Sequence, residues 1–150
     1  MSNNGKAWAA VGSSLAAVAA WYFIWTNRRA FYVNDITTGE NAAYPELRSR
    51  VYYADVPKVM LAAELSLGQL QGWKLLQVDK ENDALDAEAK IGGPFVSDVT
   101  VYVVSIGHEQ TRVKIRSHSR AAGGDWGRNA AYIRQLQSAM DDRLNTDSAF

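Results

Sequence analysis

The 150-residue sequence contains no cysteine and only three prolines, and its first thirty residues carry no acidic side chain. Without cysteine the chain has no disulfide, no thiolate metal ligand and no cysteine nucleophile. Sixteen basic and sixteen acidic residues give a formal net charge of zero, which removes the usual electrostatic case for nucleic-acid binding. A chain of this length suits one domain with a sizeable core.

Familiar catalytic signatures are also missing. The sequence has no G-x-S-x-G elbow, no P-loop and no dinucleotide-binding fingerprint. Its two histidines, His108 and His118, are ten residues apart and lack companions at metal-ligand spacing. We therefore predict a protein that is not an enzyme and that holds neither a cofactor nor a metal. A hydrolase using Ser117 or Ser119 is the least favoured alternative.

A stretch of twenty residues without charge, Ala7 to Thr26, lies near the start of the chain. A helix of about 20 residues matches the thickness of a bilayer core. Trp8 lies near one end of the stretch, and Trp21, Tyr22 and Trp25 lie near the other, as in an aromatic belt. We expect residues 1–29 to form one membrane-spanning anchor, so that the protein is a single-pass membrane protein.

Two other interpretations of this stretch are a cleaved signal peptide and a buried core helix. Lys6 and the small residues Ala17 and Ala19 fit a signal peptide, but the apolar run continues beyond them to Trp25. A core helix normally has a polar stripe, which is absent here. Two arginines follow the stretch and one lysine precedes it, which predicts that the rest of the chain lies in the cytoplasm.

Small residues recur along the predicted anchor. Gly12, Ala16 and Ala20 are spaced four apart, and this spacing lets a second helix approach closely. The simpler explanation is that such rows arise by chance in any alanine-rich helix. The row predicts helix packing against other membrane protein subunits within the lipid bilayer.

The remainder of the chain divides into a predicted linker, residues 30–49, and a head domain, residues 50–150. The head shows a strand at 50–53, a helix from about 56 to 70 that Asp55 can cap, and a closing helix from Asp125 or Trp126 to about Leu144. Between the helices, strands are expected near 73–78, 84–91, 99–104 and 112–120. This order predicts an α+β fold, an antiparallel sheet of about five strands with two helices on one face, similar in plan to helix-grip folds.

Charge is segregated within the head. Residues 79–88 hold five acids and one base, whereas residues 112–134 hold six bases and one acid. Cross-strand ion pairs on the solvent face explain this simply. The alternative is a basic face held against anionic lipid or an acidic partner.

The segment from Arg116 to Asn129 reads RSHSRAAGGDWGRN. It resembles the signature R-S-x-S-R-x-G-x-x-D-x-G-x-N-x-x-R-I of the domain of unknown function 1499 family. The resemblance extends from about Arg50 to the last helix. It differs at Ala122, where the family usually has glycine, and at Tyr132, where it has arginine. It implies a fold but no established activity.

Two interpretations of this motif follow from its residues. Ser117 and Ser119 are expected on the apolar face of their strand, and Arg116 and Arg120 on the opposite face. The motif then forms either a hydrogen-bonded corner joining strand to helix or an anion site beside a helix N-terminus. The candidate interaction or anion site comprises Arg116, Ser117, Ser119, Arg120, Asp125 and Asn129.

Together these features predict a non-catalytic accessory or assembly subunit of a larger membrane protein complex, for example a photosynthetic or respiratory one. The alternative function is a membrane-proximal binding module for a lipid or another apolar or anionic small ligand. That alternative predicts a roomy cavity between the sheet and the last helix.

Overall fold

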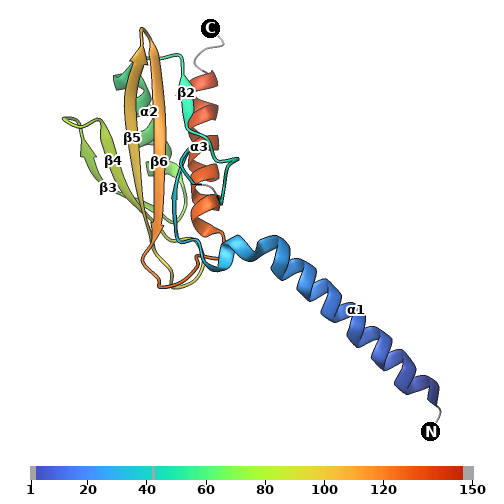
Figure 1. Ribbon diagram of the computed structural model, residues 1–150. Helices are drawn as coiled ribbons and strands as arrows, with labels where there is room; N and C mark the ends of the chain where they lie inside the picture. Colours follow the sequence, from blue (N-terminus) through green and yellow to red (C-terminus); the bar gives the residue numbers. More distant parts are fainter. Residues whose placement is uncertain (1–2, 42, 147–150) are drawn as a thin grey trace.

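The computed structural model describes residues 3–41 and 43–146 (Figure 1). In chain order the helices and strands are α1 (Asn3–Asn27), the 3-10 helix η1 (Arg28–Phe31), β1 (Asp35–Thr37), β2 (Arg50–Tyr52), α2 (Val56–Gln69), β3 (Trp73–Asp79), β4 (Ala84–Ala89), β5 (Ser97–Gly107), β6 (Gln110–Ser119) and α3 (Arg128–Thr146). We call residues 28–146 the globular region.

The strands form one antiparallel sheet in the order β1-β6-β5-β4-β3, with β2 also paired to β6. β1 and β2 lie one after the other along the same side of β6: β1 pairs with Arg116 to His118, and β2 with Thr111 to Val113. β1 lies within residues 30–49, which were expected to be a linker, and it makes the sheet six-stranded instead of five-stranded. Its central residue Ile36 is fully buried, which explains why this segment joins the core.

Both α2 and α3 cover the same face of the sheet. The strands that face them alternate buried apolar residues with outward polar ones, and the buried set includes Leu85, Ala87, Val99, Val101, Val113 and Ile115. α3 contributes Ile133, Leu136 and Met140, each fully buried. The predicted α+β fold is confirmed, and the space between the sheet and α3 is filled by these side chains.

Local signals set the ends of both helices. Asp55 caps α2 by accepting a hydrogen bond from the backbone N–H of Lys58 at 3.0 Å. α3 begins at Arg128, later than the predicted start at Asp125 or Trp126. The delay arises because the backbone turns through left-handed conformations at Gly123, Trp126 and Gly127, with φ of 86°, 59° and 78°.

α1 extends away from the globular region as a separate helix (Figure 1). Its large apolar side chains from Leu15 onward are all exposed, for example Val18 at 65% and Phe23 at 63%. Among the described residues, no helix is long and apolar enough to cross a membrane, so the predicted membrane-spanning anchor is not supported. The alanines and serines of this stretch add little apolar surface. Ala16 and Ala20 are exposed on α1, and the surroundings of Gly12 lie outside the described side chains.

Candidate functional site

Asn129, in the first turn of α3, joins three segments of the chain. Its side chain is fully buried. Its Oδ1 accepts a hydrogen bond from the Ser117 hydroxyl on β6 at 2.7 Å, and its Nδ2 donates to the carbonyl of Asn34 at 2.8 Å. One amide therefore connects α3, β6 and the residue that precedes β1.

Asp125 lies three residues before the start of α3. Its carboxylate accepts hydrogen bonds from the backbone N–H groups of Gly127, at 2.9 Å, and of Asn129, at 2.5 Å. The residue is 4% exposed, and this burial raises the pKa of the carboxyl above its ordinary value although both hydrogen bonds favour the charged form. The N–H groups that would attract an external anion to this helix end thus already bind a carboxylate of the same chain.

Ser119, 3% exposed, accepts a hydrogen bond from the N–H of Ala121 at 3.3 Å. On the opposite face of β6, the two arginines of the motif form ion pairs. Arg116 pairs with Asp35 at 2.6 Å, and Arg120 pairs with both Asp98 and Glu88.

The six candidate residues therefore do not converge on one place. Ser117, Ser119, Asp125 and Asn129 lie on the buried side of β6, and the two arginines lie on its outer face. Every one of these groups has a hydrogen-bond or ion-pair partner within the chain. This arrangement favours a corner that holds α3 against β6; binding of an anion there stays a prediction.

The Arg116–Asp35 pair predicts a pH dependence. Hydrogen bonds from Arg116 hold the pKa of Asp35 below its ordinary value of 3.8. The pair therefore stabilises the fold at pH values above the unfolded pKa, and this contribution is lost as pH falls through the folded pKa. We expect Arg116→Gln to flatten the decline of the unfolding free energy below about pH 4, measured by urea titration at a series of pH values. An unchanged slope would contradict this assignment.

Arg128 was not singled out by its sequence context, although it lies inside the motif. Its guanidinium stacks over the ring of Phe95 at 4.7 Å from the centroid, and its Nη1 is buried without a hydrogen-bond partner. Gly93 lies beside it, with an added Cβ only 3.4 Å from Nη2. The stack ties the loop between β4 and β5 to the start of α3.

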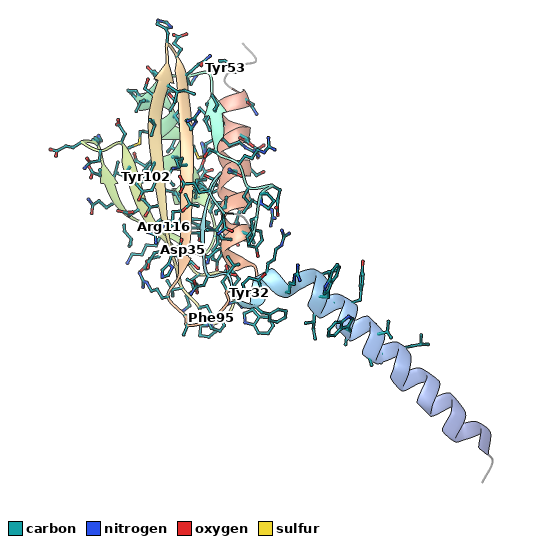
Figure 2. All side chains as sticks on the ribbon, viewed as in Figure 1. Tyr32, Asp35, Tyr53, Phe95, Tyr102 and Arg116 are labelled. Atoms are coloured by element: carbon teal, nitrogen blue, oxygen red, sulfur yellow. The ribbon has the colours of Figure 1, made fainter. Side chains whose placement is uncertain are left out.

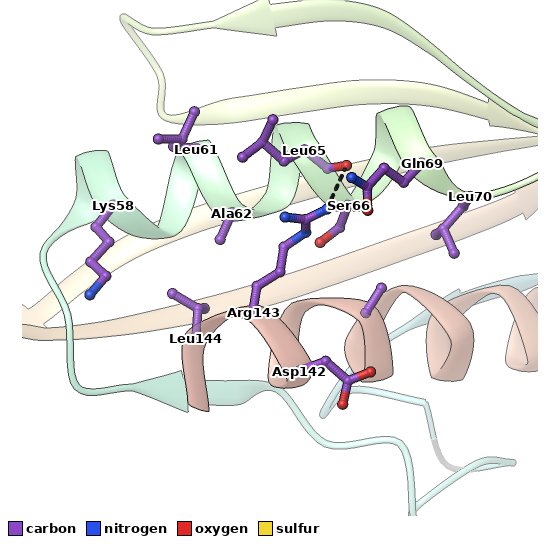
Figure 3. Close-up of a pocket in the computed structure, with 11 residues that line it drawn as sticks. Lys58, Leu61, Ala62, Leu65, Ser66, Gln69, Leu70, Asp142, Arg143 and Leu144 are labelled. Atoms are coloured by element: carbon purple, nitrogen blue, oxygen red, sulfur yellow. Dashed lines mark hydrogen bonds between the residues drawn. The ribbon is translucent and has the colours of Figure 1, made fainter. Parts of the chain in front are cut away.

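A groove of about 740 Å³ runs between α2 and α3 (Figure 3). Leu61 and Leu65 of α2 line it and remain 54% and 45% exposed. Arg143 of α3 crosses it and donates hydrogen bonds to the carbonyl of Leu65 and to Oε1 of Gln69. The hydroxyl of Ser66 is buried at the groove without a hydrogen-bond partner. This groove lies outside the cavity position expected from the sequence.

Over the part of the chain that the structure describes, no three histidine, aspartate or glutamate side chains gather to hold a metal ion. Ser117 donates its hydroxyl hydrogen to an amide oxygen, not to a base. Neither serine of the motif is accessible to a substrate.

The chain matches one protein family in sequence, and it shares its fold with solved structures of other proteins. The family described as "protein of unknown function (DUF1499)" matches residues 27–140, most of the chain. The chain belongs to the DUF1499 family. The DUF1499 match begins at the last residue of α1, so it covers residues 28–140 of the globular region and leaves the rest of α1 outside. The sequence matches none of the curated proteins.

Two solved structures resemble the DUF1499 fold. Norcoclaurine synthase from Thalictrum flavum, in complex with dopamine and hydroxybenzaldehyde, has a TM-score of 0.50 and 10% identity, and the match covers 81% of this chain and 91% of that chain. A START superfamily protein from Mycobacterium smegmatis has a TM-score of 0.49 and 9% identity, with 76% of this chain and 99% of that chain covered. The likeness to norcoclaurine synthase agrees with the predicted helix-grip arrangement, and at 10% identity it concerns the fold alone.

Proposed function

We propose that this DUF1499 protein is a non-catalytic accessory subunit of a larger membrane protein complex, which it joins through α1. The observation that carries the proposal is the exposed apolar surface of α1. Leu15, Val18 and Ile24 are more than half exposed, on a helix that leaves the globular region without packing against it (Figure 1). Large apolar side chains that project from an isolated helix are stabilised when other apolar groups cover them. Helices of partner subunits, together with lipid, supply that cover.

The globular region would then act by contact. Its charged outer face is largely neutralised by internal ion pairs, and its motif serines are buried. Neither feature offers groups for a chemical step. We place the globular region on the cytoplasmic side, on the basis of the two arginines that follow α1.

Replacing small residues of α1 with larger ones tests this proposal. We expect Ala16→Leu combined with Ala20→Leu to prevent close helix approach, and so to abolish co-purification of partner chains in mild detergent. Native sizing of the extracted protein would shift from a large complex to the lone chain. Val18 lies about 200° around the helix from Ala16, so Val18→Phe adds bulk on the other side and should leave the complex intact. A wild-type chain that migrates alone would refute the proposal.

The groove between α2 and α3 favours a second candidate function, the binding of an apolar small ligand or lipid. It combines exposed leucines with a buried hydroxyl that lacks a partner. In native mass spectrometry of protein extracted in mild detergent, this function predicts a bound small molecule that Ala139→Trp displaces by filling the groove. Ala131→Trp, on an exposed position of α3 away from the groove, is the matched control. Absence of any adduct from the wild-type chain would reject this candidate.

A further inference from the structure

Exposed apolar side chains gather at the end of the globular region from which α1 leaves. They come from three segments: η1 and the residue after it, the loop between β4 and β5, and the loop between β6 and α3 (Figure 2). We call this set the junction surface, and its members with their exposed fractions are Phe31 (37%), Tyr32 (63%), Ile91 (42%), Phe95 (38%) and Trp126 (65%).

Contacts between the segments hold the junction surface together. The rings of Phe31 and Trp126 meet edge to face with centroids 4.8 Å apart. The backbone N–H of Trp126 donates to the carbonyl of Ala30 at 2.8 Å, and that of Asp125 donates to the carbonyl of Val33 at 3.2 Å. These contacts hold η1, which directly follows α1, against the loop between β6 and α3.

The conformation of Trp126 indicates that its exposure has a use. Its φ of 59° is left-handed, which costs free energy for a bulky residue, and yet the indole remains 65% exposed. Burial does not explain why a tryptophan occupies this strained position. A partner that covers the indole would.

The charges around the junction surface are positive. Its three segments, together with the first residue of α3 (residues 28–32, 90–96 and 120–128), contain five basic residues and one acidic residue, Asp125. Asp125 is buried and accepts a hydrogen bond from the backbone N–H of Asn129, and Arg29 pairs with Glu46. Arg28 and Lys90 are exposed, and neither has a carboxylate within ion-pair distance among the described residues. Arg116 and Arg120 on the outer face of the sheet are instead neutralised by acids.

We propose that the junction surface lies against the headgroup region of an anionic lipid bilayer, with Tyr32 and Trp126 in the interface and Arg28 and Lys90 facing lipid phosphates. Tyrosine and tryptophan favour this region because one end of each ring system is apolar and the other is polar. Basic side chains add attraction to anionic lipid. The surface is also continuous with the aromatic end of α1, where Trp25 lies within cation–π distance of Arg28. The inference deepens the proposed function, since it assumes attachment to a membrane.

Because the chain has no cysteine, a single introduced cysteine can be labelled uniquely with an environment-sensitive fluorophore. Tyr32→Cys places the label on the junction surface, and Tyr53→Cys places it at the opposite end of the globular region (Figure 2). Both tyrosines are exposed, at 63% and 82%. With the full-length chain and vesicles of equal parts phosphatidylcholine and phosphatidylglycerol, we expect a blue shift for the label at 32 and none for the label at 53.

Several outcomes would overturn the inference: no shift at 32, equal shifts at both positions, or a shift at 32 that appears only when a protein partner is added. The last of these would assign the surface to a protein. The vesicle measurement needs no partner chain, whereas the proposed function is tested by co-purification from the native membrane. The two proposals can therefore fail separately.

Two double variants test whether the basic residues of the junction surface contribute to lipid binding. Arg28→Gln with Lys90→Gln should lower partition onto the anionic vesicles by about thirty-fold, and should have little effect with phosphatidylcholine alone. Lys80→Gln with Arg112→Gln removes the same charge at the other end of the globular region and should leave the partition unchanged. An equal loss with both pairs would show that general attraction, and not an oriented contact, holds the protein to lipid.

Discussion

Replacing Gly124 with alanine should destabilise the protein by about 3 kcal/mol and detach η1 from the globular region. A Cβ on Gly124 would lie 2.1 Å from the carbonyl carbon of Phe31 and 2.5 Å from the carbonyl oxygen of Ala30. Backbone atoms cannot rotate away as a side-chain end can, so η1 must move. That movement also breaks the hydrogen bond from Trp126 to Ala30.

Two measurements check this result. Urea unfolding followed by tryptophan fluorescence gives the loss of stability. Trypsin digestion under native conditions should cut faster after Arg28 and Arg29 in Gly124→Ala, because η1 is no longer held. Gly68→Ala is a suitable control, since nothing lies within 4 Å of its added Cβ and alanine favours the helix in which it lies. If Gly124→Ala unfolds at the wild-type urea concentration, the close contact with η1 is wrong.

Asn129→Ala should also cost about 3 kcal/mol, for a different reason. It leaves the Ser117 hydroxyl without its partner in a buried site and opens a small cavity. It also removes one of the two hydrogen bonds that the Asn34 carbonyl accepts, and the bond from the backbone N–H of Ser119 remains. Ser117→Ala removes only one of these bonds and should cost about 1 kcal/mol. Equilibrium denaturation of both variants measures the difference. Similar losses for the two would show that the bond to Asn34 contributes nothing.

The segment from Arg116 to Asn129 shows how much of the motif could be predicted from sequence. The alternation of residues 112 to 120 correctly predicted that Ser117 and Ser119 face inward and that Arg116 and Arg120 face outward. The last helix was expected to start at Asp125 or Trp126, and the carboxylate of Asp125 does bind an N–H group in the first turn of α3, which starts at Arg128. The hydrogen bond from Asn129 to Asn34 could not be predicted, because Asn34 lies 95 positions away and contributes only a backbone carbonyl. A backbone carbonyl leaves no pattern in the sequence.

The strands and helices of residues 50–150 were largely predictable because their apolar residues recur with clear periods. β1 was missed because it has three residues and a single buried apolar side chain, too short for any period to show. The anchor was predicted from an absence of charge, which does not distinguish a helix made of small residues and aromatic rings from one rich in leucine. The junction surface leaves no pattern in the sequence because its three segments meet only in the folded chain.

The arrangement of strands at the two margins of the sheet has a consequence for solubility. An unpaired, flat strand at a sheet margin can recruit the same strand of another molecule and begin aggregation. On one side, β1 and β2 divide the length of β6 into two strands of three residues, so no long template is presented. On the other, β3 has an irregular register between Leu75 and Gln77, which interrupts its pairing pattern. Both margins are thus poor templates, which protects a protein that already carries an exposed apolar helix from a second route to self-association.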